Sequence, residues 1–343
     1  MTTKLLLRHL LAAVLFCGTM SLHSQDIHFS QFYNSPLVLN PALTGVSRGD
    51  IRLTGIYRSQ WRSANAPYKT IHAAADKKFY SIAHETWWLN AGISMFYDRA
   101  GDANVSTSNI ALSGSYTKML DKENFLSFGI SAGLGQRMFE IQNLTFDNQW
   151  NGDVFDPNRG TSENFSDGNI IYPDFGVGLN YRGQKSKTRS KIDLGAGVYH
   201  FNRPNQSYQS SDKSQLASRL SMYFLPTIQV NEKLDIVGQA AAQIQGNYLE
   251  TIAGAAGRLY LSTKKSQEIA VQLGFEYRFN AKGDAFAPTV EVHYHDWMVG
   301  LSWDLNVSDF SVATNRNGGP EIALRYIIYK VYPIKAFKAC PLI

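Results

Sequence analysis

Apolar side chains in this chain alternate with small or polar ones, and this period of two restricts its fold more than any other feature. One row of residues 268–279 is apolar: Ile269, Val271, Leu273, Phe275, Tyr277 and Phe279. The opposite row is small or polar: Ala270, Gln272, Gly274, Glu276 and Arg278. Such alternation predicts a strand with one apolar face, in a soluble sheet or in a membrane barrel. Glycine mixed with charged residues on the second face favours the crowded, polar interior of a barrel.

The same pattern recurs along the chain. It is clear in residues 126–135, 297–304 and 322–328, and Trp297 and Trp303 stand at the two ends of one apolar row. Aromatic residues at both ends of such a row are typical of the interfacial girdles of outer-membrane barrels. No apolar run approaches the roughly 20 residues of a membrane-spanning helix, because the longest is Leu10 to Cys17. We therefore predict an all-β, transmembrane antiparallel β-barrel of about 14 strands over residues 49–332.

Connection lengths predict the orientation of this barrel. The long connections at 142–169, 203–216 and 307–318 are the fifth, seventh and thirteenth, whereas the short ones at 120–124, 231–233 and 295–296 are even-numbered. External loops of outer-membrane barrels are long and periplasmic turns are short. The amino end is therefore expected to lie in the periplasm, and the chain to form one barrel without a second domain.

Three segments flank the predicted barrel. Residues 1–24 carry Lys4 and Arg8, then an apolar stretch, and end on small Ser24, which predicts a secretory signal peptide that is cleaved during export. Residues 25–48 show no clear period and are expected to be an irregular, periplasmic or plug-like segment. Residues 333–343 are expected to be a periplasmic tail. Removal of the signal would leave Cys340 as one thiol, which cannot form an internal disulfide.

Motifs for chemistry are weak. His293 and His295 are two apart in a predicted strand, as a metal pair would be, but no third ligand is identifiable. The run Asp147 to Gly152 resembles the first half of a calcium loop, yet Asn158 stands where the closing Glu would be needed, so a polar external loop is the better interpretation. No Gly-x-Ser-x-Gly elbow and no phosphate-binding glycine loop is present. We predict neither an enzyme nor a bound metal or cofactor.

Net charge is +5, but no dense run of Lys and Arg accompanies it, so nucleic acid is not an expected partner. Charged residues on the small or polar rows are instead expected to line the lumen. A lumen filled by such side chains argues against a wide pore. The lumen candidates are Glu276, Arg278, Glu291, His293 and Arg325.

Several motifs resemble one family. They are Gln25-Asp26, Phe29-Ser30-Gln31, Asn40-Pro41-Ala42, Tyr57-Arg58-Ser59-Gln60-Trp61, Asp98 with Gly101, Gly300-Leu301-Ser302-Trp303-Asp304, Gly318-Gly319-Pro320-Glu321 and Cys340-Pro341. In these motifs the chain is similar to the PorP/SprF family over nearly its whole predicted mature length. It departs from the family in Trp303, where Tyr is usual, and in a tail that ends without the frequent Arg-Phe.

The resemblance implies a component of the type IX secretion system of Bacteroidetes, linked in some members to gliding motility. It implies an outer-membrane barrel that assists export or surface attachment of large adhesins with a type B carboxy-terminal sorting domain. The implied partners are that adhesin, other components of the system and outer-membrane lipid. An alternative function is a porin or hydrophobic-solute channel, and an outer-membrane hydrolase is a third.

The family supplies no residue-level binding site. We expect the amino-terminal segment and the tail to contact the secretion machinery, and the external loops to face the adhesin. The partner-contact candidates in the amino-terminal segment are Phe29, Gln31, Asn34, Pro36, Asn40 and Pro41.

Overall fold

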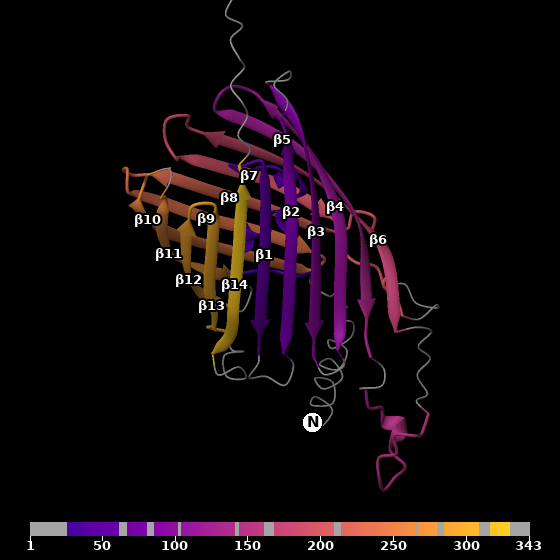
Figure 1. The fold of residues 1–343 in the computed structure, drawn as a ribbon. Helices are drawn as coiled ribbons and strands as arrows, with labels where there is room; N and C mark the ends of the chain where they lie inside the picture. The colour runs from indigo at the N-terminus through magenta and orange to yellow at the C-terminus, as the bar shows by residue number, and fades with distance from the viewer. Residues whose placement is uncertain are drawn as a thin grey trace, which may run out of the picture.

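The computed structural model describes residues 26–61, 67–80, 86–101, 104–140, 144–160, 168–208, 214–264, 267–279, 285–308 and 316–329. Fourteen antiparallel strands close into one barrel, each paired with its neighbours in sequence and β1 with β14 (Figure 1). The prediction of an antiparallel barrel of about 14 strands is confirmed. The predicted signal peptide and tail lie outside the described residues.

The strands are β1 (Ile51–Gln60), β2 (Tyr68–Phe79), β3 (Trp87–Ala100), β4 (Val105–Met119), β5 (Asn124–Met138), β6 (Asn169–Gln184), β7 (Lys191–Tyr199), β8 (Arg219–Gln229), β9 (Leu234–Gln245), β10 (Tyr248–Ser262), β11 (Ile269–Phe279), β12 (Ala285–Tyr294), β13 (Trp297–Asn306) and β14 (Asn317–Ile328). Three short helices, η1 (Phe32–Asn34), α2 (Pro36–Leu39) and η2 (Pro41–Leu43), precede the barrel, and η4 (Asp147–Gln149) lies between β5 and β6.

The apolar rows of the strands face outward. Leu273 is 60% exposed, whereas Gln272 and Glu276 on the opposite row of β11 are each 1% exposed. Large apolar side chains on an outer surface need a non-aqueous environment, which the hydrocarbon of a membrane provides. Among the described residues, no helix is long and apolar enough to cross a membrane.

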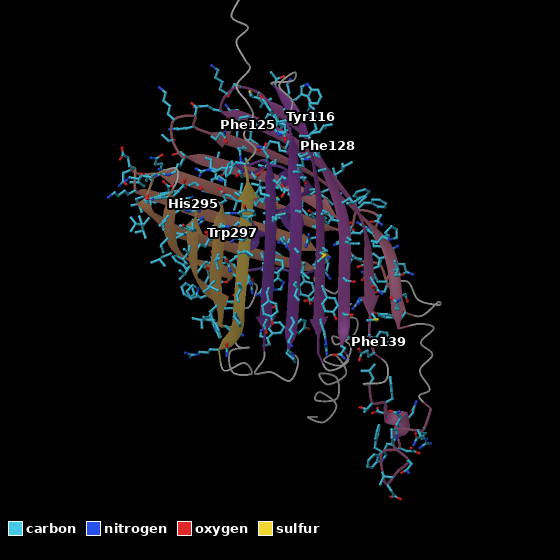
Figure 2. All side chains as sticks on the ribbon, in the orientation of Figure 1. Tyr116, Phe125, Phe128, Phe139, His295 and Trp297 are labelled. Carbon is cyan, nitrogen blue, oxygen red and sulfur yellow. The ribbon has the colours of Figure 1, made fainter. Side chains whose placement is uncertain are left out.

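Aromatic side chains mark the ends of the strands (Figure 2). Tyr116 and Phe128 lie near the top of the barrel, and Phe139 lies where β5 leaves it at the bottom. The Trp297 ring stacks on Tyr326 with 4.3 Å between ring centroids. Such rings suit the two membrane interfaces, because they combine an apolar body with a polar edge.

Odd-numbered connections meet at one end of the barrel and even-numbered ones at the other. The odd end, at the bottom of Figure 1, carries the long connections 139–168 and 200–218, and the first of these projects far from the barrel. The even end carries short turns, such as 230–233 and 295–296. We call them the long-loop end and the short-turn end. By the usual asymmetry of outer-membrane barrels, the long-loop end is expected to face outward from the cell.

Long and short connections alternate less regularly along the chain than the sequence suggested. The ninth connection is only residues 246–247, and the third is residues 101–104, although both lie at the long-loop end. A two-residue turn at Gly246, whose φ is +58°, closes β9 and β10 directly because glycine adopts this left-handed conformation without strain. Loop length therefore distinguishes the two ends only when all the connections are considered together.

Candidate functional site

Residues 26–48, which we call the plug, fill the lumen of the barrel. Their short helices begin at prolines, Pro36 in α2 and Pro41 in η2, where a missing N–H costs nothing. The side chain of Asn40 accepts a hydrogen bond from the N–H of Ala42 and so caps η2. The resulting irregular chain is buried against inward-facing residues all around the barrel wall.

The long-loop end of the plug is held by an ionic cluster. The Asp26 carboxylate lies 2.9 Å from Nε2 of His200 and 2.8 Å from a guanidinium nitrogen of Arg219. Nδ1 of His200 lies 2.7 Å from the Asp174 carboxylate, and the backbone N–H of Asp26 donates to Oε1 of Gln245. This cluster, which we call the latch, ties the first described residue to β6, β8, β9 and the loop after β7.

The residues of the latch shift one another's pKa values. Burial disfavours the charged form of His200, but the carboxylates of Asp26 and Asp174 outweigh burial and raise the pKa of His200 to about 9. Burial also opposes ionisation of Asp26, yet the neighbouring Arg219 and His200 hold the pKa of its carboxyl well below its ordinary value. At neutral pH the latch is therefore an ion network of two cations and two carboxylates.

The middle of the plug contacts β11 to β14 through carboxylates. The backbone N–H groups of Ser30 and Gln31 donate to the two oxygens of Glu321, at 2.9 and 2.7 Å. The amide of Asn34 donates to Glu291 at 3.0 Å. These carboxylates accept backbone and amide donors that would otherwise be unsatisfied in the interior.

Asn40 anchors the plug to the opposite wall. Its Nδ2 lies 2.8 Å from the carbonyl oxygen of Leu179 and 3.1 Å from that of Ala196, so it bridges β6 and β7. It also lies 3.1 Å from the hydroxyl of Tyr223 on β8. The hydroxyl of Tyr199 donates to the carbonyl of Leu37 at 2.5 Å.

The short-turn end of the plug is fixed by one acid. The Asp76 carboxylate accepts the N–H of Gly45 at 2.7 Å and two guanidinium hydrogen bonds from Arg52. Arg52 also donates to the carbonyl of Leu43 at 2.9 Å. Gly45 has φ of +70°, a conformation that glycine adopts readily, and the chain turns there towards β1.

Two apolar clusters fill the gaps between these polar contacts. One joins Phe32, Leu39 and Leu43 of the plug to Tyr223 and Ile252 of the wall. The other joins Ile27 and Phe29 to Ile56 and Ala323. The plug and the wall thus share two apolar clusters, in addition to their hydrogen bonds.

All six partner-contact candidates are buried in this arrangement. Phe29 is 2% exposed, and Gln31, Asn34 and Asn40 are exposed by at most 1%, while Pro36 and Pro41 are buried in α2 and η2. Each therefore faces the barrel wall. A direct contact with another protein would require the plug to move.

The lumen candidates lie along the plug. Tyr33 donates to Glu276 at 3.3 Å, Arg278 donates to Oγ of Ser30 at 2.9 Å, and Glu291 accepts from Asn34. Arg325 donates to Oδ1 of Asn34 at 3.4 Å, and His293 lies 3.0 Å from Glu291.

Sequence reasoning did not assign a role in holding the plug to Arg52, Arg58, Asp76, Asp304 or Glu321, although Arg58, Asp304 and Glu321 lie in the family motifs. Each is a charged residue on the inward row of a strand. The alternation that identified Glu276 applies to them as well. It could have identified them, but it could not have named their plug partners.

The residues of the two candidate metal-binding motifs lie in turns or form ordinary hydrogen bonds. His295 lies in the turn after β12 with φ of +52°, so the expectation that it shares a strand with His293 is wrong. The Asn151 side chain accepts the N–H groups of Asp153 and Val154, and Asp156 accepts that of Asn158, which makes turns of the calcium-like loop. Within the described ranges, no group of three or more His, Cys, Asp or Glu side chains is arranged to hold a metal.

Cavities remain at both ends of the plug. One of about 560 Å³ opens at the long-loop end beside Asp26 and His28, and is walled by Trp61, Tyr172 and Tyr248. Two others, of about 200 and 370 Å³, flank Val46 to Arg48 at the short-turn end. The plug separates these two sets of cavities.

Comparison with known proteins points to one family. A family model described as "Type IX secretion system membrane protein PorP/SprF" matches residues 21–326. No curated protein matches the sequence.

Several solved structures resemble this chain at low sequence identity. The CymD monoaromatic hydrocarbon channel is 9% identical, with 90% of this chain and 96% of that chain covered and a TM-score of 0.49. A Pseudomonas aeruginosa FadL homologue is 10% identical, with 84% and 92% covered and a TM-score of 0.47. The siderophore receptor PirA from Acinetobacter baumannii is 11% identical with a TM-score of 0.36, and the match covers 75% of this chain but 43% of the receptor. Likenesses this distant carry no functional argument.

Proposed function

This chain belongs to the PorP/SprF family of type IX secretion system membrane proteins, and we propose that it assists export or surface attachment of large adhesins with a type B sorting domain. Family and fold indicate a secretion or channel barrel of the outer membrane. We further propose that residues 1–24 are a cleaved signal peptide that delivers the chain to that membrane.

The filled lumen is the observation that carries this proposal. A channel for solutes needs a continuous path, whereas the plug here is bonded to the wall at the latch, at Glu321, at Asn40 and at Asp76. A plugged barrel is better suited to act as an anchor or docking protein than as an open pore. This argues against the porin alternative for the protein in this conformation.

The connection between β5 and β6 supplies a contact surface for the adhesin. It projects from the long-loop end (Figure 1) and exposes Trp150, Val154 and Phe155, at 55, 59 and 43%. Trp150 and Phe155 pair through an isolated β-bridge, which holds the three apolar side chains on one short hairpin. Exposed apolar and aromatic side chains of this kind are typical of protein-binding surfaces.

Deletion of the gene, followed by mass spectrometry of surface and culture-fluid proteins, tests this function. We expect loss of one or a few large proteins with type B sorting domains, with other secretion intact. Loss of all type IX cargo would make the protein a core component instead. An unchanged surface proteome with altered uptake of a small solute would refute the proposal and favour a channel.

A double variant tests the contact surface. Replacing Trp150 and Phe155 with Ser should release the adhesin from the cell into the medium while the barrel remains in the membrane. Leu120→Ser with Val230→Ser, two exposed apolar residues in short turns at the other end, is the matched control. Equal retention of the adhesin by both variants would exclude this hairpin as the contact.

A further inference from the structure

A cavity of about 370 Å³ at the short-turn end is lined by cations alone among its charged residues. We call this cavity the cationic vestibule. Its charged lining residues are Arg48, Lys78, Arg182, Lys185, Arg189 and Lys191. They come from the plug exit, from β2, β6 and β7, and from the turn between β6 and β7. Cations gathered in this way repel one another unless an anion compensates them.

Internal carboxylates compensate only part of this charge. Arg182 pairs with Asp193 and Arg189 pairs with Asp235, both at short distances of 2.7 to 2.8 Å. Arg48 lies 3.9 Å from Glu268, a loose contact between partly exposed groups. Carboxylates also act electrostatically on the three lysines: Asp50 and Asp76 on Lys78, Asp193 on Lys191, and Glu123 on Lys185. The lining of the vestibule itself nevertheless carries Lys and Arg side chains as its only charged groups.

The opposite mouth differs in charge. The cavity at the long-loop end has Asp26, His28, Asp98 and Arg137 as its titratable lining residues, apart from tyrosines, so its lining includes carboxylates as well as bases. Because the cations predominate in the lining at only one mouth of the barrel, this distribution does not simply follow from the basic composition of the chain. It raises the local concentration of anions at the short-turn end alone.

Three features indicate what kind of anion fits. Three of the lining cations are lysines, whose ammonium groups bind carboxylates as point charges without a fixed fork geometry, and one of these, Lys78, also donates to the carbonyl of Ser47 at 3.2 Å. The β6–β7 turn beside them already holds one carboxylate, because Glu123 accepts hydrogen bonds from N and Oγ of Ser186 at 2.9 and 3.0 Å. Trp88 and Phe125 supply an aromatic wall for the apolar part of a ligand.

A ligand cannot readily reach the vestibule through the lumen or from the lipid bilayer. The plug closes the lumen, so a ligand enters from the short-turn end, which we assign to the periplasm. Thr117 and Ser127 of the vestibule wall are inward-facing and buried, whereas Tyr116 and Phe128 next to them face lipid. A phospholipid headgroup would therefore have to leave the bilayer plane to reach the lysines.

We propose that the cationic vestibule binds an acidic peptide segment of a periplasmic partner. Carboxylate side chains of that segment would pair with Lys78, Lys185 and Lys191. The plug exit at Val46 to Arg48 forms one wall, so the bound segment would lie against the end of the plug. This inference does not depend on which adhesin is exported, because it concerns the other face of the barrel.

Binding of a fluorescein-labelled polyglutamate peptide to the full-length barrel in detergent tests this site by fluorescence anisotropy. The variant Lys78→Gln/Lys185→Gln/Lys191→Gln should lose roughly ten-fold or more in affinity. The control Lys118→Gln/Lys122→Gln/Lys233→Gln removes three other lysines at the same end and should stay within about two-fold of wild type. Correct folding of each variant is checked by its heat-modified migration on gels.

Several results would overturn the proposal. Equal losses in the two triple variants would mean unspecific attraction to the rim. Displacement of the peptide by inorganic phosphate at much lower concentration than by free glutamate would identify a phosphate site instead. Preferential binding to phosphatidylglycerol vesicles would identify a lipid site. If the triple variant does not fold, Lys185→Glu in the exposed turn replaces it, and unchanged peptide affinity in that variant would equally refute the site.

Discussion

Asn40 of the plug lies against Gly178 of β6 so closely that a Cβ atom on Gly178 would overlap Oδ1 of Asn40. The same contact occurs at Gly129 of β5, where a Cβ would overlap the backbone N of Ala42. Glycines on the inward rows thus make room for the plug backbone. The wall and the plug are complementary in shape, in addition to being hydrogen-bonded.

Gly178→Val should displace the plug or destabilise the barrel. Overpacking of a well-packed interior costs about 1–3 kcal/mol. We expect a lower midpoint of unfolding by denaturant and measurable conductance in planar bilayers. Gly257→Val is the control, since a Cβ there meets no atom within 4 Å. Identical behaviour of the two variants would contradict close packing between plug and wall.

Asp304→Asn should be strongly destabilising. Its carboxylate pairs with Arg58 and Arg278, whose side chains are at most 5% exposed, and it accepts a hydrogen bond from Ser30. Loss of this charge leaves the two buried guanidinium groups with only the more distant carboxylates of Glu321 and Glu250, each at 3.7 Å, and breaking a buried ion pair costs about 3–5 kcal/mol. Glu268→Gln breaks the loose, exposed pair with Arg48 and should cost about 0–1 kcal/mol. Denaturant unfolding in lipid vesicles measures both, and similar losses would be evidence against a buried network.

The latch should make stability depend on pH. The pKa of His200 rises from 6.5 to about 9, a difference worth roughly 3 kcal/mol. Because the native value is the higher one, this contribution is complete below about pH 6.5 and is lost as the pH rises through about 9. The lowered pKa of Asp26 acts in the opposite sense, and its contribution is lost only in strong acid.

The variant His200→Gln isolates this effect. Its melting temperature should lie below that of wild type at pH 6, and the difference should shrink as the pH approaches about 10. Thermal unfolding monitored by circular dichroism across this range provides the measurement. A difference that stays constant with pH would mean that His200 contributes only by packing.

A charged residue on an outward-facing row should destabilise the barrel when it lies at the middle of a strand. Leu273 lies at the middle of β11 and is 60% exposed to the surroundings of the barrel. Leu273→Arg should destabilise the barrel by about 2–4 kcal/mol if hydrocarbon surrounds it. Leu120→Arg, at a similarly exposed leucine in a short turn, should be nearly neutral. Unfolding equilibria in vesicles would reject a membrane setting if both substitutions were harmless.

Orientation is tested by labelling cysteines on intact cells. With Cys340 replaced by Ser, Asn158→Cys in the long β5–β6 connection should react with a membrane-impermeant maleimide. Lys233→Cys in the turn between β8 and β9 should react only after the outer membrane is opened. The reverse labelling pattern would mean that the barrel has the opposite orientation in the membrane, with the cationic vestibule at the cell exterior.

The sequence by itself determined the barrel, its approximate strand number and the inward or outward face of residues such as Leu273 and Glu276. These follow from a local rule, because alternate side chains of a strand point to opposite faces whatever the rest of the chain does. Short motifs along the chain indicated the family in the same local manner.

Only the tertiary structure decided where residues 26–48 lie and what they contact. Asp26 and His200 are 174 residues apart in sequence, and Asn34 and Glu291 are 257 apart. No period relates an irregular segment to the strands that surround it, so its position depends on barrel closure, on lumen width at glycines such as Gly178, and on the matching of buried donors with acceptors. The sequence therefore could not show that Asn40 bonds to β6, β7 and β8 in the folded chain, and its contact with a partner protein stays a prediction.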